Sequence, residues 1–70
     1  MNTQNTARID KQAQLVNDLD AQVESLQKAY DKAKEQGLNT EELTQEIWKV
    51  QGALFEAKRV YNALVDLEFR

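Results

Sequence analysis

The sequence contains neither cysteine nor histidine. Without cysteine the chain has no disulfide and no thiolate metal site, so its fold depends on packing or on association with other chains. Without both residues, the usual nucleophile–base pairs and the usual zinc ligands are missing. Neither the Glu-x-x-His pairs of a di-metal carboxylate bundle nor a glycine-rich phosphate loop occurs. We therefore expect no enzymatic activity, no cofactor, no metal and no small-molecule substrate.

Proline is also absent, and only two glycines interrupt 70 residues that are rich in Ala, Leu, Gln, Glu and Lys. This composition is typical of long, uninterrupted helices, so the sequence predicts an all-α protein. A chain of this length forms one small domain and buries only about 60% of the surface that it exposes when unfolded. Its stability therefore has to come from efficient helix packing or from a partner.

Long apolar runs are missing as well. No segment approaches the roughly 20 apolar residues that cross a bilayer, and Met1 to Ala13 lack the apolar core of a secretory signal. We expect a cytoplasmic protein with no membrane contact. The net charge of −3 lacks the basic excess that neutralises phosphates, so nucleic-acid binding by a dimer is the least favoured function.

What the sequence does contain is a heptad repeat. Counting in sevens from Ile9, the a and d positions keep an unbroken 3-4 spacing over four heptads. These positions form the first half of a hydrophobic seam: Ile9, Gln12, Val16, Leu19, Val23, Leu26, Tyr30 and Ala33. The spacing predicts a helix over about residues 6–36, after a flexible N-terminus over residues 1–5. Gln12 is polar, and either fixes the register through a buried hydrogen bond or lies half exposed near the helix start.

A hinge is predicted at Gly37, Leu38 and Asn39. Gly37 suits the left-handed position that ends a helix, and Leu38 can fold back toward Ala33 as in a Schellman motif. Asn39 then reads as the N-cap of a second helix, with Glu42 three residues later completing a capping box. Because the connection is so short, the two helices must be antiparallel neighbours.

The second helix is predicted over about residues 40–69 and repeats the spacing of the first. Its half of the seam consists of Leu43, Ile47, Val50, Leu54, Ala57, Tyr61 and Leu64. Folding the chain at Leu38 pairs Tyr30 with Ile47 and Leu26 with Val50, so two independently read repeats agree on one hinge. We therefore expect residues 6–70 to form a single antiparallel two-helix hairpin, coiled-coil-like and pairing into a four-helix bundle dimer.

Apolar residues outside the seam predict an interface. Trp48 and Phe55 lie one heptad apart on one side of the second helix, and Val60 and Leu67 lie on the other. Large apolar surfaces usually mark interfaces, and tryptophan is enriched among binding hot spots. The candidate partner or oligomer interface consists of Leu15, Trp48, Phe55, Val60, Leu67 and Phe69.

These residues allow three arrangements: the core of a homodimer, a docking surface for an unidentified protein, or side chains that fold back on their own hairpin. The preferred function is a non-enzymatic interaction module, a small adaptor or chaperone-like protein that self-associates or docks a partner through the second helix. The alternative is a small inhibitor or regulator, of the kind that phages or mobile elements encode, which blocks a larger protein's surface.

The span from about Leu19 to Leu67 resembles the hairpin co-chaperones that help hold needle subunits in type III secretion. It is also similar to the C-terminal hairpin of a group of small helical regulators in Gram-positive bacteria. The Gly37-Leu38-Asn39 turn and the Leu/Ala spacing carry both resemblances. Unrelated hairpins share these features, so the sequence assigns no family.

Overall fold

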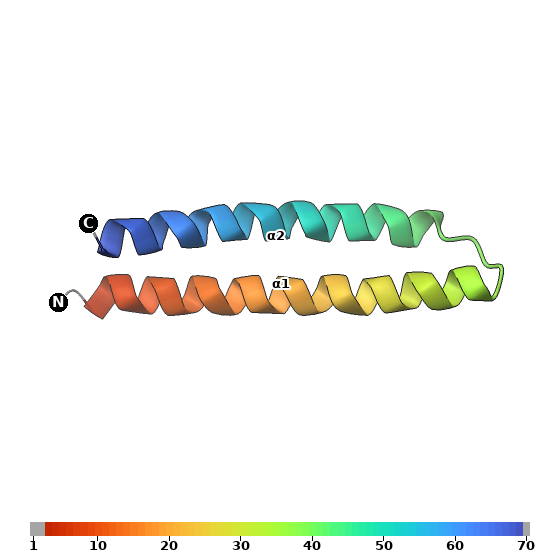
Figure 1. Ribbon diagram of the computed structural model, residues 1–70, viewed down its shortest axis with the longest axis horizontal. Helices are drawn as coiled ribbons and strands as arrows, with labels where there is room; N and C mark the ends of the chain where they lie inside the picture. The colour runs from red at the N-terminus through yellow and green to blue at the C-terminus, as the bar shows by residue number, and fades with distance from the viewer. Residues whose placement is uncertain (1–2, 70) are drawn as a thin grey trace.

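The computed structural model describes residues 3–69 and consists of two helices (Figure 1). Helix α1 spans Thr3–Glu35 and helix α2 spans Glu41–Glu68. They pack side by side in opposite directions, so the start of α1 and the end of α2 lie at one end of a rod that measures 55 × 14 × 13 Å over its Cα atoms. No strand occurs within residues 3–69. The predicted all-α hairpin is confirmed.

The beginning of α1 differs from the sequence prediction. The helix begins at Thr3, whereas the heptad repeat predicts a start near residue 6. Residues 3–5, which we expected to belong to a flexible N-terminus, are therefore part of the helix, and residues 1–2 of that segment lie outside the described residues. The prediction failed here because the first polar turn adds nothing to the seam, and the seam was the signal that set the boundary.

The turn that ends α1 has the predicted geometry. Gly37 has a φ of 73°, in the left-handed region that favours glycine. The Leu38 amide donates to the Ala33 carbonyl at 2.9 Å, and the Gly37 amide donates to the Lys34 carbonyl at 3.1 Å. These are the two hydrogen bonds of a Schellman motif. A side chain at Gly37 would meet no atom within 4 Å, so the backbone angle, rather than lack of space, requires glycine.

The start of α2 corrects one prediction. Thr40, not Asn39, is the N-cap residue, because its carbonyl already accepts a hydrogen bond from the Thr44 amide at 2.9 Å. The Asn39 side chain still satisfies a free amide, since its Oδ1 accepts a hydrogen bond from the Glu41 amide at 3.0 Å. With Thr40 as N-cap, Glu42 stands at the second helical position rather than the third. The predicted capping box between Asn39 and Glu42 is therefore wrong.

The seam lies between the helices as the heptads predict. Tyr30 and Ile47 line one groove together, and Leu26 and Val50 line another, as the predicted register requires. The buried side chains among the described residues are Ile47, Val50, Leu54 and Ala57, with exposed fractions between 5% and 9%. The remaining seam residues are half-buried: Ile9, Gln12, Val16, Leu19, Val23, Leu26, Tyr30, Ala33, Leu43, Tyr61 and Leu64.

Gln12 makes a hydrogen bond between the two helices. Its Nε2 donates to the Ala57 carbonyl at 2.9 Å. Gln12 is half-buried, and Ala57 is 5% exposed. Both readings of Gln12 therefore hold in part: the side chain is half exposed, and it also joins the helices in one register.

Candidate protein-interaction surface

Seven large apolar side chains are exposed among the described residues: Leu15, Leu38, Trp48, Phe55, Val60, Leu67 and Phe69. They include all six residues that the sequence analysis proposed for an interface, and Leu38 of the hinge is the addition. Trp48 is 68% exposed and Phe55 is 65% exposed. Four of the seven project from α2, so this helix carries apolar side chains well beyond its seam.

The exposed residues lie on two opposite sides of the hairpin. In an antiparallel pair, the e positions of both helices, with the neighbouring b positions, line one side, and the g positions, with the neighbouring c positions, line the other side. We call the first side the Trp48 flank, which consists of Asp20, Gln27, Thr44, Trp48, Gln51 and Phe55. We call the second side the Val60 flank, which consists of Leu15, Gln22, Glu46, Ala53, Val60 and Leu67. The structure therefore divides the predicted interface into two surfaces.

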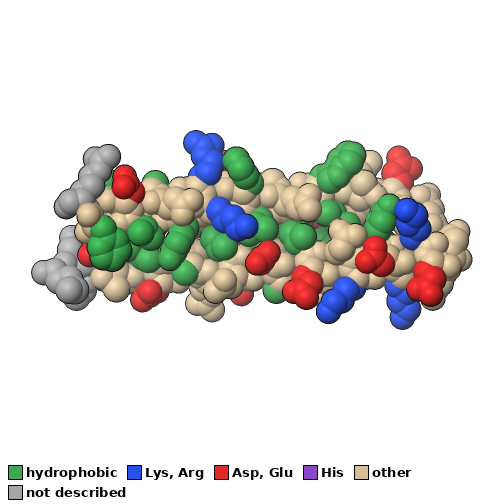
Figure 2. All heavy atoms as spheres, viewed as in Figure 1, with side chains coloured by type: hydrophobic (Ala, Val, Ile, Leu, Met, Phe, Trp, Pro, Cys, Tyr) green, Lys and Arg blue, Asp and Glu red, His purple; other side chains and the backbone are tan. Residues whose placement is uncertain are grey.

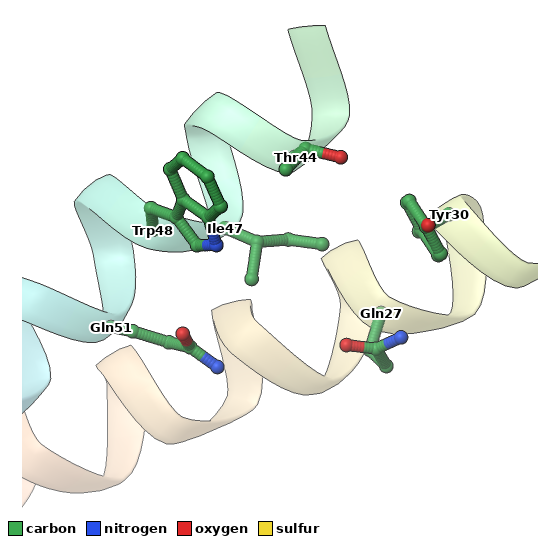
Figure 3. A pocket seen from close by; sticks show the side chains of 6 residues that line it. All are labelled: Gln27, Tyr30, Thr44, Ile47, Trp48 and Gln51. Carbon is green, nitrogen blue, oxygen red and sulfur yellow. The ribbon is translucent and has the colours of Figure 1, made fainter. Parts of the chain in front are cut away.

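The Trp48 flank contains a shallow groove with a volume of about 230 Å³. Figure 3 shows the side chains around it, which are Thr44, Ile47, Trp48 and Gln51 from α2, and Gln27 and Tyr30 from α1. Gln27 also donates to Asp31 Oδ1 on its own helix at 3.3 Å. The groove is therefore mixed in character, because three polar side chains line it together with Ile47, Tyr30 and the exposed indole at the edge formed by α2.

Acidic side chains dominate the α1 side of this flank. The exposed acids at its heptad positions are Asp10, Asp20, Glu24 and Asp31. The base at these positions is Lys34, whose Nζ lies 5.9 Å from the centre of the Tyr30 ring. Glu24 pairs with Lys28 at 3.8 Å, and because both side chains are more than 70% exposed, the pair contributes little to stability. On the face shown in Figure 2, acidic side chains run along α1 and hydrophobic ones lie between the helices and along α2.

The Val60 flank is more apolar. One groove of about 410 Å³ is lined by Gln12, Leu15, Leu19, Ala53, Glu56, Ala57 and Val60. A second groove of about 430 Å³ is lined by Ala21, Gln22, Ser25, Leu26, Glu46 and Val50. Both grooves open onto seam residues from the side. The hairpin therefore leaves part of its own core accessible on this flank.

Charges of opposite sign occupy the two helices of the Val60 flank. On α1 the exposed charges at its heptad positions are Arg8, Lys11, Asp18 and Lys32. On α2 they are Glu42, Glu46, Lys49 and Glu56. Arg59 lies 3.5 Å from Glu56, in a pair that is about two-thirds exposed. The flank is therefore basic along α1 and acidic along α2, whereas α1 is acidic on the Trp48 flank.

Sequence reasoning missed the polar residues that line the grooves. These residues lie beside the seam of α2 and are Gln51, Glu46 and Glu56. The heptad count identifies their positions once the two helices are set antiparallel. Within residues 3–69 no three acidic side chains gather as metal ligands would. Neither helix, over the same residues, holds an apolar stretch long enough to span a membrane.

Comparison of the chain with protein-family models, with curated proteins and with solved structures finds no match. No family is assigned. The function is therefore inferred from the two flanks alone.

Proposed function

We propose that this chain is a non-enzymatic protein-interaction module, a small helical-hairpin adaptor that pairs with a second copy into a four-helix bundle. The observation that carries the proposal is the incomplete core. Among the described residues four side chains, all on α2, are buried, whereas six large apolar side chains outside the hinge remain exposed. A two-helix hairpin covers each seam from one direction only, so a further layer of helices is needed to complete its burial.

The Val60 flank is the surface we assign to the second copy. Its grooves expose Leu19, Leu26 and other seam residues, so covering them extends the existing core. The small side chains of Ala53 and Val60 allow helices to approach closely. A stable interface buries roughly 800 Å² per partner. The chain has 5678 Å² of accessible surface spread along a rod, and one flank is large enough to supply that area.

The charges on this flank select the orientation of the two copies. A twofold axis parallel to the helices places α1 of one copy against α2 of the other, and a perpendicular axis places like helices together. The first arrangement brings Lys32 of one copy level with Glu42 and Glu46 of its partner, and Leu15 level with Val60, although Asp18 then lies near the level of Glu56. The second would place acidic helix against acidic helix. We therefore propose that both hinges lie at the same end of the dimer.

Light scattering after size exclusion, over a range of protein concentrations, tests this proposal. We expect the mass of a dimer that dissociates on dilution. Val60→Ser should raise the dissociation constant of the dimer by about tenfold or more, because it removes apolar contact area at the centre of the interface. The matched control is Phe55→Ser on the opposite flank, which should leave the mass unchanged.

Two outcomes contradict the proposal. A monomer at every concentration would show that the chain does not self-associate. A dimer that withstands Val60→Ser but is lost in Phe55→Ser would show that self-association uses the Trp48 flank instead. Circular dichroism of both variants is the accompanying measurement, since helicity must be retained for the masses to be compared.

A further inference from the structure

We infer that the Trp48 flank binds a basic amphipathic helix supplied by a different protein. This inference rests on the proposed function as an interaction module, but it does not require the dimer. It assigns the two flanks to different occupants, the Val60 flank to a second copy and the Trp48 flank to a partner of opposite charge.

The aromatic side chains determine the shape of the partner. Trp48 and Phe55 are separated by one heptad, which is two turns of α2, and both are about two-thirds exposed. A helix that lies along α2 presents apolar residues at the same spacing, so its i, i+3, i+4 and i+7 side chains can cover both rings at once. Tryptophan in the centre of such a contact is a typical hot spot.

The charge of α1 determines the chemistry of the partner. Asp10, Asp20, Glu24 and Asp31 are all exposed at the heptad positions of this flank. A helix seated against Trp48 and Phe55 places one of its polar edges over this acidic row. Lysine and arginine residues on that edge would gain favourable electrostatic contacts, whereas acidic residues would be repelled.

A second copy does not fit this surface as well. The Trp48 flank is acidic along α1, and α2 contributes Glu41 and Lys58 at its positions on the same side, so α2 offers no basic row to match. The groove beside Trp48 is lined by three polar side chains, Gln27, Thr44 and Gln51, as well as by apolar ones, whereas the groove beside Val60 is lined mostly by apolar side chains. The polar groups beside Trp48 suit hydrogen bonds to the partner's edge more than burial against a second hydrophobic core.

The single tryptophan makes the binding measurable, because Trp48 is the only one in the chain. The probe is a synthetic helix of about five turns, with leucine at the i, i+3, i+4 and i+7 positions, lysine elsewhere and no aromatic residue. A second peptide carries glutamate in place of every lysine. We expect the lysine peptide to shift Trp48 emission to shorter wavelength in a saturable way, and the glutamate peptide to cause no shift.

Two pairs of variants locate the site. Asp20→Lys should weaken binding of the lysine peptide on the order of tenfold. Asp18→Lys makes the same charge change two residues away but on the Val60 flank, and should change the affinity by no more than about twofold. Phe55→Ala, which keeps the fluorescent reporter, should also weaken binding on the order of tenfold, and Val60→Ala should not.

Equal losses for Asp20→Lys and Asp18→Lys would overturn the inference, because they would mean that the peptide responds to overall charge. Binding without a change in Trp48 emission would overturn it as well, since the peptide would then sit elsewhere. The mass of the chain is measured by light scattering in the same samples. A monomer that still binds the lysine peptide would reject the dimer and keep this inference, and a dimer that does not bind would do the reverse.

Discussion

Helices α1 and α2 have seams of the same spacing, yet the four buried side chains among the described residues all belong to α2, and the seam of α1 is half-buried throughout. The residues around the two seams explain this difference. On α2 the seam is bordered by Trp48 and Phe55 on one side and by Ala53, Val60 and Leu67 on the other. On α1 the corresponding neighbours are mostly Gln, Asp and Lys, which keep their polar ends in water. The seam of α2 is therefore the more completely buried half of the hairpin, and the seam of α1 is the more open half.

The largest expected effect tests this asymmetry directly. Leu54→Ala removes a buried side chain of α2 and should lower the free energy of unfolding by about 3 kcal/mol. Leu19→Ala makes the same change on α1, but Leu19 lines an open groove, so the expected loss is about 1 kcal/mol. Urea-induced unfolding followed by circular dichroism, at concentrations below dimerisation, measures both. Equal losses in the free energy of unfolding would mean that the seam residues of the two helices contribute equally to stability.

Protein concentration sharpens the same comparison. If a second copy covers the Val60 flank, Leu19 becomes buried in the dimer. The loss in the free energy of unfolding caused by Leu19→Ala should then increase as the protein concentration rises. The cost of Leu54→Ala should change less, because Leu54 is already buried in the hairpin. If the difference between the free energies of unfolding of the two variants stays constant over the concentrations at which the dimer forms, a second copy does not cover this flank.

The comparison of the helices also shows what the sequence can and cannot predict. The hinge was predictable because a Schellman ending depends on local chemistry, namely a glycine at the left-handed position and the amide that follows it. Both seams were predictable because the 3-4 spacing repeats over many turns. The N-cap was misplaced by one residue, because the Asn39 side chain, one residue before the cap, accepts a hydrogen bond from the Glu41 amide, while Thr40 takes the N-cap position without a capping bond from its side chain.

The heptad pattern does not predict the difference in burial between α1 and α2. A repeat gives the direction in which a side chain points, but burial depends on what lies around it after the helices have met. The same holds for the candidate site. The sequence identified Trp48, Phe55 and Val60 as surplus apolar residues on two sides of the second helix but assigned them to one interface, whereas the different charge of the two flanks emerged only when the exposed residues of both helices were placed side by side.

The two glycines offer a second, smaller contrast between the helices. Gly37→Val at the end of α1 should lower the free energy of unfolding by about 2 kcal/mol, because a β-branched residue is strained at a φ of 73°. Gly52→Ala inside α2 should raise it by up to about 1 kcal/mol, since the glycine is exposed and an added Cβ meets nothing within 4 Å. Thermal unfolding of both variants shows whether each substitution lowers or raises the stability. A destabilising Gly52→Ala would indicate that another helix approaches α2 at this point.

The smallest expected effect concerns the hydrogen bond from Gln12 of α1 to the backbone of α2. Gln12→Ala removes the Nε2 donor to the Ala57 carbonyl and should cost about 1 kcal/mol. Gln14→Ala, two residues along on the exposed face of α1, is the matched control and should cost less than about 0.5 kcal/mol. Hydrogen exchange of the α2 amides distinguishes a register lock from a simple contact. If Gln12 fixes the register, its loss should speed exchange along the whole seam of α2, whereas faster exchange confined to the turn around Ala57 would reduce its role to local packing.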